Sequence, residues 1–371
     1  MTVVENVGSE ESVVGERILL LVGTKKGAFI IESGRDRRSW SVRGPECAGY
    51  PIHDISHDPA TGTLFAGGGS PWYGPTVFRS NDLGLTWVQS SDGLTYDEAG
   101  PKVSAVWNVT AAHGAVHAGV GPAGLFRSED GGRTWSHVQG LTNHPSRSTW
   151  QPGAGGLILH TILPHPTDQA RMWVGISAVG TFETRDGGLT WEPRNRGVRA
   201  DFLPDPHPET GQCVHKLVMA AGEPEHLYQQ NHCGVYRTLN GGLEWQEITA
   251  GLPSQFGFPM VSHPRDPRTA WTIPLNGDDQ GRYMPGGHTA VWRTHDGGDS
   301  WLRGDEGLPH EHAYLSVLRE AMARDVLEPV GVYFGTSAGQ LYGSPDGGAS
   351  WGTIAATLPP IWSVEAVLVD G

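Results

Sequence analysis

The chain has 371 residues and a formal net charge of −14, from 26 basic and 40 acidic side chains. Because an acidic chain without a basic tract gains little from counterion release, we exclude nucleic acid as a partner. The first apolar run, residues 18–23, is too short for a signal-peptide core or a membrane span, and three cysteines give no even disulfide framework. We therefore expect a cytoplasmic protein without a membrane partner.

The chain begins with an acidic, polar stretch, residues 1–17, which we interpret as a flexible N-terminal segment. Residues 18–40 follow and read as three short strands that end at Trp40. Compared with the later repeats, this unit lacks its innermost strand. The missing strand is predicted at the other end of the chain, where residues 361–371 form one unattached apolar strand.

Between these ends, an octet of the type Ser/Thr-x-Asp-Gly-Gly-x-x-Trp recurs. Its copies end at Trp87, Trp135, Trp191, Trp245, Trp301 and Trp351, with a degenerate copy at Trp40, so the closing tryptophans are 47 to 56 residues apart. The aspartate and the two glycines are typical of a tight turn between two strands. Short apolar strands precede each octet, and the period matches the blades of a propeller. The sequence predicts an all-β, seven-bladed β-propeller over residues 18–371, a single domain closed by pairing of the C-terminal strand with the N-terminal blade.

These octets resemble the Asp-box, or BNR repeat, of sialidases, sortilin-type receptors, xyloglucanases and photosystem-assembly propellers. The resemblance covers nearly the whole chain and implies the propeller fold, but not one activity, because the repeat serves unrelated functions. A true sialidase is disfavoured, because the chain lacks an Arg-Ile-Pro-type motif near its start and places histidines where sialidases place axial arginines. Xyloglucanase-type relatives use two propellers, whereas this sequence contains one.

The start of each innermost strand indicates which residues reach the propeller axis. Aligning the repeats places seven residues at one level: His53, Asn108, His160, His215, Phe258, Glu320 and Trp362. Imidazoles and a carboxylate are suitable ligands for a transition metal. We therefore expect one divalent ion (Zn, Mn or Fe) held by His53, His160, His215 and Glu320. The alternative is that the histidines bond one another or water in a polar channel.

Long loops surround the same end of the predicted propeller, at residues 67–76, 142–156, 193–212, 229–234, 276–288 and 308–320. They supply candidates for proton transfer and catalysis, namely Tyr314, His312, His232 and Arg319. For substrate binding we expect Arg147, Arg199, Trp72, Trp362 and Asn108, with Arg194, Arg196 and His310 nearby. Arginines at one mouth of an acidic protein favour an anionic ligand. The alternatives are that each arginine pairs locally, that Trp107 and Trp362 fill the channel, and that Cys233 is an ordinary buried thiol.

The sequence thus predicts a metal-dependent hydrolase or lyase that acts on a small or medium anionic substrate, including sugar-derived ones. One alternative is a non-catalytic propeller that serves as a protein-binding or assembly scaffold. A second alternative is a glycoside hydrolase of the sialidase type.

Overall fold

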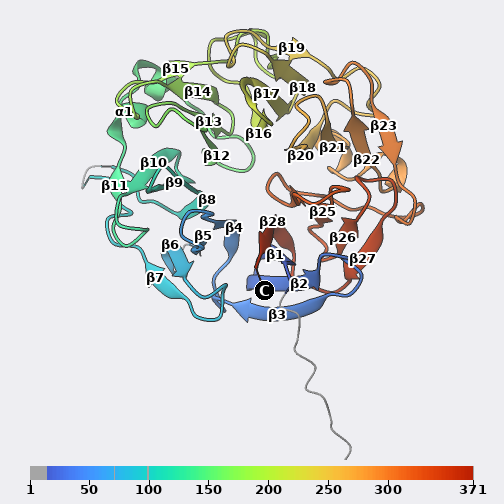
Figure 1. The fold of residues 1–371 in the computed structure, drawn as a ribbon. Helices are drawn as coiled ribbons and strands as arrows, with labels where there is room; N and C mark the ends of the chain where they lie inside the picture. Colours follow the sequence, from blue (N-terminus) through green and yellow to red (C-terminus); the bar gives the residue numbers. More distant parts are fainter. Residues whose placement is uncertain (1–14, 71, 98–99, 371) are drawn as a thin grey trace, which may run out of the picture.

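The structure is a computed structural model that describes residues 15–70, 72–97 and 100–370. In this part of the chain, 28 strands form seven four-stranded antiparallel sheets arranged in a ring (Figure 1). The prediction of a seven-bladed β-propeller is therefore confirmed. Residues 1–14 of the expected N-terminal segment lie outside the described residues, and Arg17 already belongs to the first strand.

Six blades are built from consecutive strands. Blade 1 contains β4 (Ile52–His57), β5 (Leu64–Ser70), β6 (Gly74–Ser80) and β7 (Val88–Ser90), and blade 2 contains β8 (Ala105–Ala112), β9 (Ala115–Gly121), β10 (Gly124–Ser128) and β11 (Ser136–His137). Blade 3 contains β12 (Leu159–Pro164), β13 (Met172–Ile176), β14 (Gly180–Thr184) and β15 (Glu192–Pro193), and blade 4 contains β16 (Val214–Ala220), β17 (Glu223–Asn231), β18 (Gly234–Thr238) and β19 (Gln246–Glu247). Blade 5 contains β20 (Gly257–Ser262), β21 (Ala270–Pro274), β22 (Val291–Thr294) and β23 (Leu302–Gly304), and blade 6 contains β24 (Met322–Arg324), β25 (Val332–Gly335), β26 (Leu341–Ser344) and β27 (Gly352–Ala355).

Blade 7 joins the two ends of the chain. Its innermost strand is β28 (Ile361–Val369), which pairs with β1 (Arg17–Thr24), and β2 (Gly27–Gly34) and β3 (Ser41–Glu46) complete the sheet. The pairing runs from Arg17 opposite Val369 to Thr24 opposite Ile361. The closure expected from the sequence is therefore observed. Because β1 and β28 pair with each other, neither has a free edge where the two strands meet.

The octets form the turns between the third and fourth strands. In blade 3, the Thr184 hydroxyl donates to Asp186 Oδ1 (2.9 Å), and the backbone N–H of Thr190 donates to the same oxygen (2.9 Å). Gly187 and Gly188 have φ angles of 73° and 96°, in the region that favours glycine. The same side-chain bonds recur at Asp82, Asp130, Asn240, Asp296 and Asp346. The octet is therefore a repeated structural turn.

In blades 4 and 5 the tryptophan that closes the octet forms a hydrogen bond to the preceding blade. Trp245 Nε1 donates to the carbonyl of Arg194 in the connection after blade 3, and Trp301 Nε1 donates to the carbonyl of Ile248 in blade 4, each at 2.8 Å. Both indoles are buried. In these two blades the closing tryptophan therefore joins neighbouring blades, whereas Trp87 and Trp191 donate to the carbonyls of Gly84 and Gly188 in their own turns.

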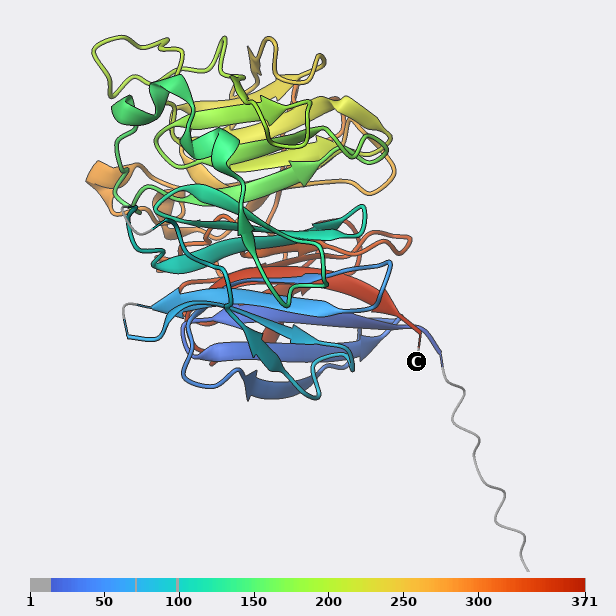
Figure 2. The same cartoon turned by 90° about the vertical axis from the view of Figure 1, so that its left-hand side faces the viewer.

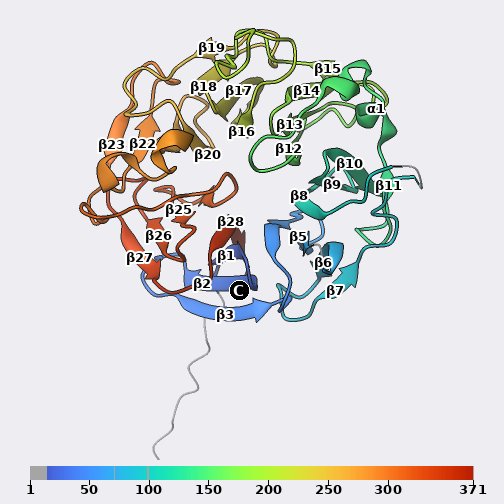
Figure 3. The same ribbon diagram turned by 180° about the vertical axis from the view of Figure 1, so that it is seen from behind.

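The two ends of the disc carry different structures. Because strands alternate in direction, the octets lie at the end opposite the starts of the innermost strands. Figure 2 shows the disc from the side, with the C-terminus on one face and the short helices on the other. Figure 3 shows that second face. Its helical turns are α1 (Gln139–Thr142) and the 3₁₀ turns η1 (Pro145–Thr149), η2 (Asp278–Gln280) and η3 (Pro285–Gly287). No helix of the described residues is both long and apolar enough to cross a membrane.

Candidate active site

A cavity of about 760 Å³ lies on the axis at the face opposite the octets. Its walls come from the starts of the innermost strands and from the loops around the mouth. The lining includes Thr149 and residues 151–155, 202–203 and 210–211 from the long interblade connections, together with His232, Asp278 and Arg282 from loops between second and third strands. Five of the six loops singled out in the sequence therefore contribute to this cavity, whereas no described residue of the loop 67–76 lines it.

β-Bulges set the level at which the axial side chains enter this cavity. In five innermost strands one residue is skipped in the pairing with the second strand; these residues are His53, Trp107, His160, His215 and Trp362. A bulge re-aims the side chain of the extra residue, and all five line the cavity. The register expected from the sequence differs at blade 2, where it placed Asn108 at this level. Trp107 occupies the bulge instead, and Asn108 lies one residue further along β8.

His53 is enclosed by aromatic rings. Its ring centroid lies 4.0 Å from that of Trp107 and 4.6 Å from that of Trp362. Burial between these rings lowers the pKa of His53 to about 3, so the imidazole is neutral at physiological pH. His53 therefore contributes a neutral, flat surface to the cavity.

His160 uses both ring nitrogens inside the protein. Nε2 lies 3.0 Å from the carbonyl oxygen of Val214, and Nδ1 lies 3.0 Å from the hydroxyl of Thr161. Burial holds the pKa of His160 well below its usual value. His160 therefore behaves as a hydrogen-bonded residue of the channel wall, as in the alternative reading of the axial histidines.

The four predicted metal ligands are not gathered at one point. Among the described residues, the donor atoms that converge belong to Cys213, His215 and His232, and they lie within 4.8 Å of one another. His215 is the one predicted ligand in this group. Its Nδ1 lies 2.6 Å from the carbonyl oxygen of Gly257, and its Nε2 lies 3.5 Å from Cys213 Sγ.

Glu320 reaches the axis but is already paired. Its Oε2 accepts a hydrogen bond from the Lys216 ammonium. Glu320 also lines a second cavity of about 450 Å³ further along the channel, together with Asp54 and Asn108. The Asn108 amide donates to Asp54 Oδ2 (2.9 Å). Asn108 therefore supports a buried carboxylate below the main cavity instead of facing a ligand at the mouth.

Two guanidinium groups face the main cavity. Arg319 lies with Cζ 5.5 Å from the ring centroid of Phe258, and burial lowers the pKa of Arg319. Its Nε is buried and makes no hydrogen bond to any described residue. Arg282 is paired instead, since its Nη2 donates to Asp278 Oδ2 at 2.7 Å. The hydrogen bond and charge of Asp278 raise the pKa of Arg282.

Of the residues predicted for catalysis and substrate binding, His232, Arg319 and Trp362 line the cavity, and the others lie elsewhere. The Tyr314 side chain is 64% exposed and His312 is also exposed; neither lines the cavity. Trp72 is 91% exposed. Arg147 lies over the Trp150 ring at 4.7 Å, and Arg199 pairs with Glu247 and Asp201.

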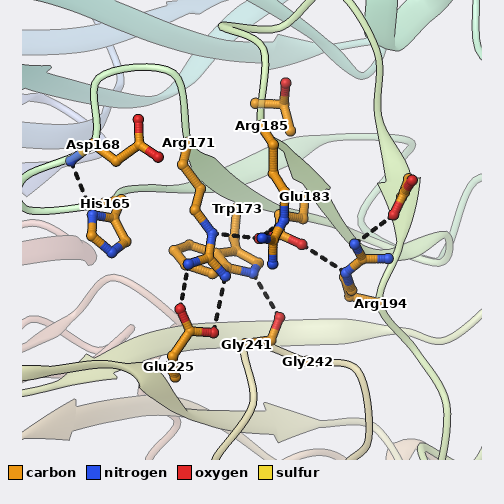
Figure 4. Close-up of polar contacts among 12 residues, drawn as sticks. His165, Asp168, Arg171, Trp173, Glu183, Arg185, Arg194, Glu225, Gly241 and Gly242 are labelled. Atoms are coloured by element: carbon orange, nitrogen blue, oxygen red, sulfur yellow. Dashed lines mark hydrogen bonds and ion pairs between the residues drawn. The ribbon is translucent and has the colours of Figure 1, made fainter.

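Arg194 belongs to an ion-pair network at the octet end (Figure 4). Its Nε donates to Glu183 Oε2 (2.7 Å), and Arg171 Nε donates to the other oxygen of that carboxylate (2.6 Å). Arg171 also pairs with Glu225 of the next blade. The local pairing expected as the alternative for the loop arginines therefore applies to Arg194 and Arg199.

The sequence interpretation did not single out three cavity residues, Cys213, Asp278 and Arg282. Cys213 is two residues before His215, a spacing that puts both side chains on one face of an extended strand. This alternation was the available signal for the Cys213 and His215 pair. Arg282 and Asp278 lie within the loop 276–288, which was identified by its length, but no feature of their spacing pointed to the axis.

The fold and the site together define a β-propeller with a polar and aromatic pocket on its axis. No protein-family model matches the chain. The chain is 25% identical over 213 residues to the oligoxyloglucan-reducing end-specific xyloglucanase of Emericella nidulans, a match that covers 49% of this chain and 25% of that protein. It is 26% identical over 277 residues to a probable enzyme of the same name from Neosartorya fischeri, covering 65% of this chain and 33% of that protein. The matches thus span a quarter to a third of these curated relatives.

Solved structures share the fold at lower identity. The GH74 xyloglucanase of Xanthomonas campestris superposes with a TM-score of 0.63 and 16% identity, over 94% of this chain and 52% of that one. YCF48 bound to a D1 peptide gives a TM-score of 0.54 and 14% identity, over 87% of each chain. A putative 6-phosphogluconolactonase from Bacteroides fragilis gives 0.57 and 11%, over 98% of this chain and 100% of that one. These likenesses establish the propeller fold.

Proposed function

We propose that this protein is a hydrolase whose substrate, a small or medium anionic molecule derived from a sugar, binds in the axial cavity. The proposal includes one divalent transition-metal ion as cofactor. A volume of about 760 Å³ lies within the range of small-molecule sites. The similarity to xyloglucanases favours hydrolysis over β-elimination. The cytoplasmic location stays a prediction.

The observation that carries the proposal is the unpartnered Arg319. Arg319 lines the cavity, and its guanidinium group forms no ion pair with a described residue, so its charge is available to a carboxylate or phosphate of a ligand. The paired Arg282 lies on the same cavity, with Cζ 5.8 Å from the Phe258 ring. A ligand that carries an anionic group beside a flat or ring-shaped body matches this combination of charge and aromatic surface.

A second candidate is the hydrolysis of a neutral oligosaccharide, which the similarity to xyloglucanases favours. Glycoside hydrolysis commonly requires two free carboxyl groups, one to give a proton. The cavity is lined by Asp278 and Glu320, and each is ion-paired, to Arg282 and Lys216 respectively. The hydrogen bond from Arg282 also lowers the pKa of Asp278. A carboxyl group with a lowered pKa is a poor proton donor, which opposes a role of Asp278 as the acid. We therefore favour the anionic substrate.

The test measures binding first and hydrolysis second. Sugar acids, sugar phosphates and neutral xyloglucan oligosaccharides are screened by calorimetry, and the compounds that bind are followed by mass spectrometry for addition of water. The variant Arg319→Gln is compared with Arg199→Gln, which removes an arginine outside the cavity. We expect anionic compounds to bind and Arg319→Gln alone to weaken them at least tenfold. Binding of neutral oligosaccharides only, or equal binding by both variants, overturns the proposal.

A further inference from the structure

We infer that Cys213, His215 and His232 bind one divalent transition-metal ion, with a donor set that suits Zn²⁺, and leave a coordination position open to the axial cavity. The inference rests on the proposed function in one respect, because it identifies the residues that would bind the cofactor of that proposal. Metal binding itself is argued from geometry and is tested without turnover.

The distances suit a tetrahedral ion. With usual Zn–S and Zn–N bond lengths, a sulfur and a nitrogen on one tetrahedral ion are separated by about 3.6 Å. Cys213 Sγ lies 3.5 Å from His215 Nε2, and the three donor atoms lie within 4.8 Å of one another. The third donor, on His232, is within reach of an ion held by the other two.

The backbone holds the ligands in place. Cys213 and His215 flank Val214 at the start of β16, and the N–H of His232 donates to the Cys213 carbonyl at 3.0 Å. His215 Nδ1 lies 2.6 Å from the carbonyl oxygen of Gly257, the kind of outer contact that fixes the orientation of metal-binding imidazoles. With Nδ1 donating its proton, Nε2 presents its lone pair toward Cys213.

The surroundings favour a catalytic type of site over a closed structural one. Three protein ligands leave the fourth position for water or substrate, and all three residues line the cavity. The thiolate supplies one negative charge, and Asp278 neutralises the nearby Arg282. Arg319 lines the same cavity as Cys213. An anionic substrate would thus meet the open metal position and the free guanidinium together.

The experiment uses full-length protein purified without a metal-affinity tag and stripped with a chelator. Zn²⁺ binding is measured by calorimetry, and Co²⁺ is added separately as a spectroscopic probe. We expect one equivalent of either ion, and a sulfur-to-cobalt charge-transfer band in the near ultraviolet that reports a thiolate ligand. Cys213→Ser should abolish this band, and Cys213→Ser and His232→Gln should each weaken Zn²⁺ binding at least 100-fold, more than a typical outer-shell loss.

The matched control is Cys233→Ser, which removes a buried thiol of the same blade that does not belong to the group. It should retain both the band and full affinity. Absence of stoichiometric binding, or Co²⁺ binding without the band, overturns the inference, and the second readout needs no variant to fold. Metal binding without hydrolysis contradicts the proposed function alone, whereas hydrolysis that depends on Arg319 in a protein that binds no stoichiometric metal contradicts this inference and the proposed cofactor, but not the hydrolase itself.

Discussion

The imidazole of His53 stacks on the indole of Trp362, with ring centroids 4.6 Å apart and an interplanar angle of 21°. His53 belongs to β4 of blade 1, and Trp362 belongs to β28, the last strand of the chain. The strand that closes the ring therefore also supplies one wall of the axial cavity. Closure of the fold and assembly of the site depend on the same segment.

We predict that deletion of residues 361–371 abolishes cooperative folding. The deletion removes the strand that pairs with β1 along its whole length, and with it the buried side chains of Ile361, Val364 and Val367. Thermal unfolding followed by circular dichroism measures the effect. Deletion of residues 370–371 alone, beyond β28, is the control and should leave Tm unchanged. A protein shortened at residue 361 that keeps the Tm of the full chain would show that closure is dispensable.

The octet turns lead to a second prediction, in which the chain supplies its own control. Asp186→Ala removes the acceptor of the Thr184 hydroxyl and of the Thr190 N–H and hydroxyl. Asp186→Asn keeps an acceptor, as Asn240 does at the equivalent position of blade 4. We expect the alanine variant to lower Tm by about 1–3 °C and the asparagine variant to change it little. Equal losses in both variants would contradict a role for these bonds.

The fold was predictable because each octet combines local turn chemistry with a fixed spacing. Asp186, Gly187 and Gly188 determine one turn by themselves, and repetition of that turn implies repeated sheets. The closure was also predictable, since the first unit lacks the strand that the last segment supplies. These features depend on short-range interactions that a sequence displays directly.

The site was less predictable because its geometry depends on bulges and on contacts between blades. Counting along β8 gives Asn108 as the axial residue, but the bulge places Trp107 there. Likewise, the sequence does not show which arginines are paired. Arg199 bonds to Glu247, 48 positions away, whereas Nε of Arg319 has no partner among the described residues. Such long-range pairs decide which polar residues remain available for a ligand.

Our third prediction concerns the network of Figure 4. The Glu183 side chain is fully buried and accepts hydrogen bonds from Arg171 and Arg194, which are themselves 8% and 11% exposed. Removing the carboxylate leaves buried guanidinium groups without full compensation. We expect Glu183→Gln to lower the free energy of unfolding by about 3–5 kcal/mol, as for other buried pairs that lose one partner.

Denaturant unfolding measures this loss, and Glu225→Gln serves as the control. The Glu225 side chain also pairs with Arg171 but is 44% exposed, so water can replace its contribution. The control should cost about 1 kcal/mol or less. A Glu183 variant no less stable than the Glu225 variant would indicate that water reaches the network.

The fourth prediction is a pH dependence of stability that originates in the second cavity. Burial raises the pKa of Glu365 to about 8 and that of Asp54 to about 7, and nearby negative charge adds to both shifts, that of Asp54 at Glu365 and that of Glu320 at Asp54. Their ordinary values are about 4.3 and 3.9. Lys216 and Arg324 act in the opposite direction on Glu365 but do not outweigh burial.

Between pH 4 and 8 the folded state therefore holds protons that the unfolded chain has lost. Stability is then highest below the unfolded pKa values and falls as pH rises through this window, because the folded state binds more protons than the unfolded state. Glu365→Gln removes one titrating group while keeping its shape. Relative to the unmodified protein, this variant should gain at least about 1 kcal/mol in the free energy of unfolding between pH 5 and pH 9, since one pKa unit corresponds to about 1.4 kcal/mol. Denaturant titrations of both proteins at the two pH values measure the gain. If the stability difference between the variant and the unmodified protein is the same at pH 5 and pH 9, Glu365 ionises normally in the folded protein.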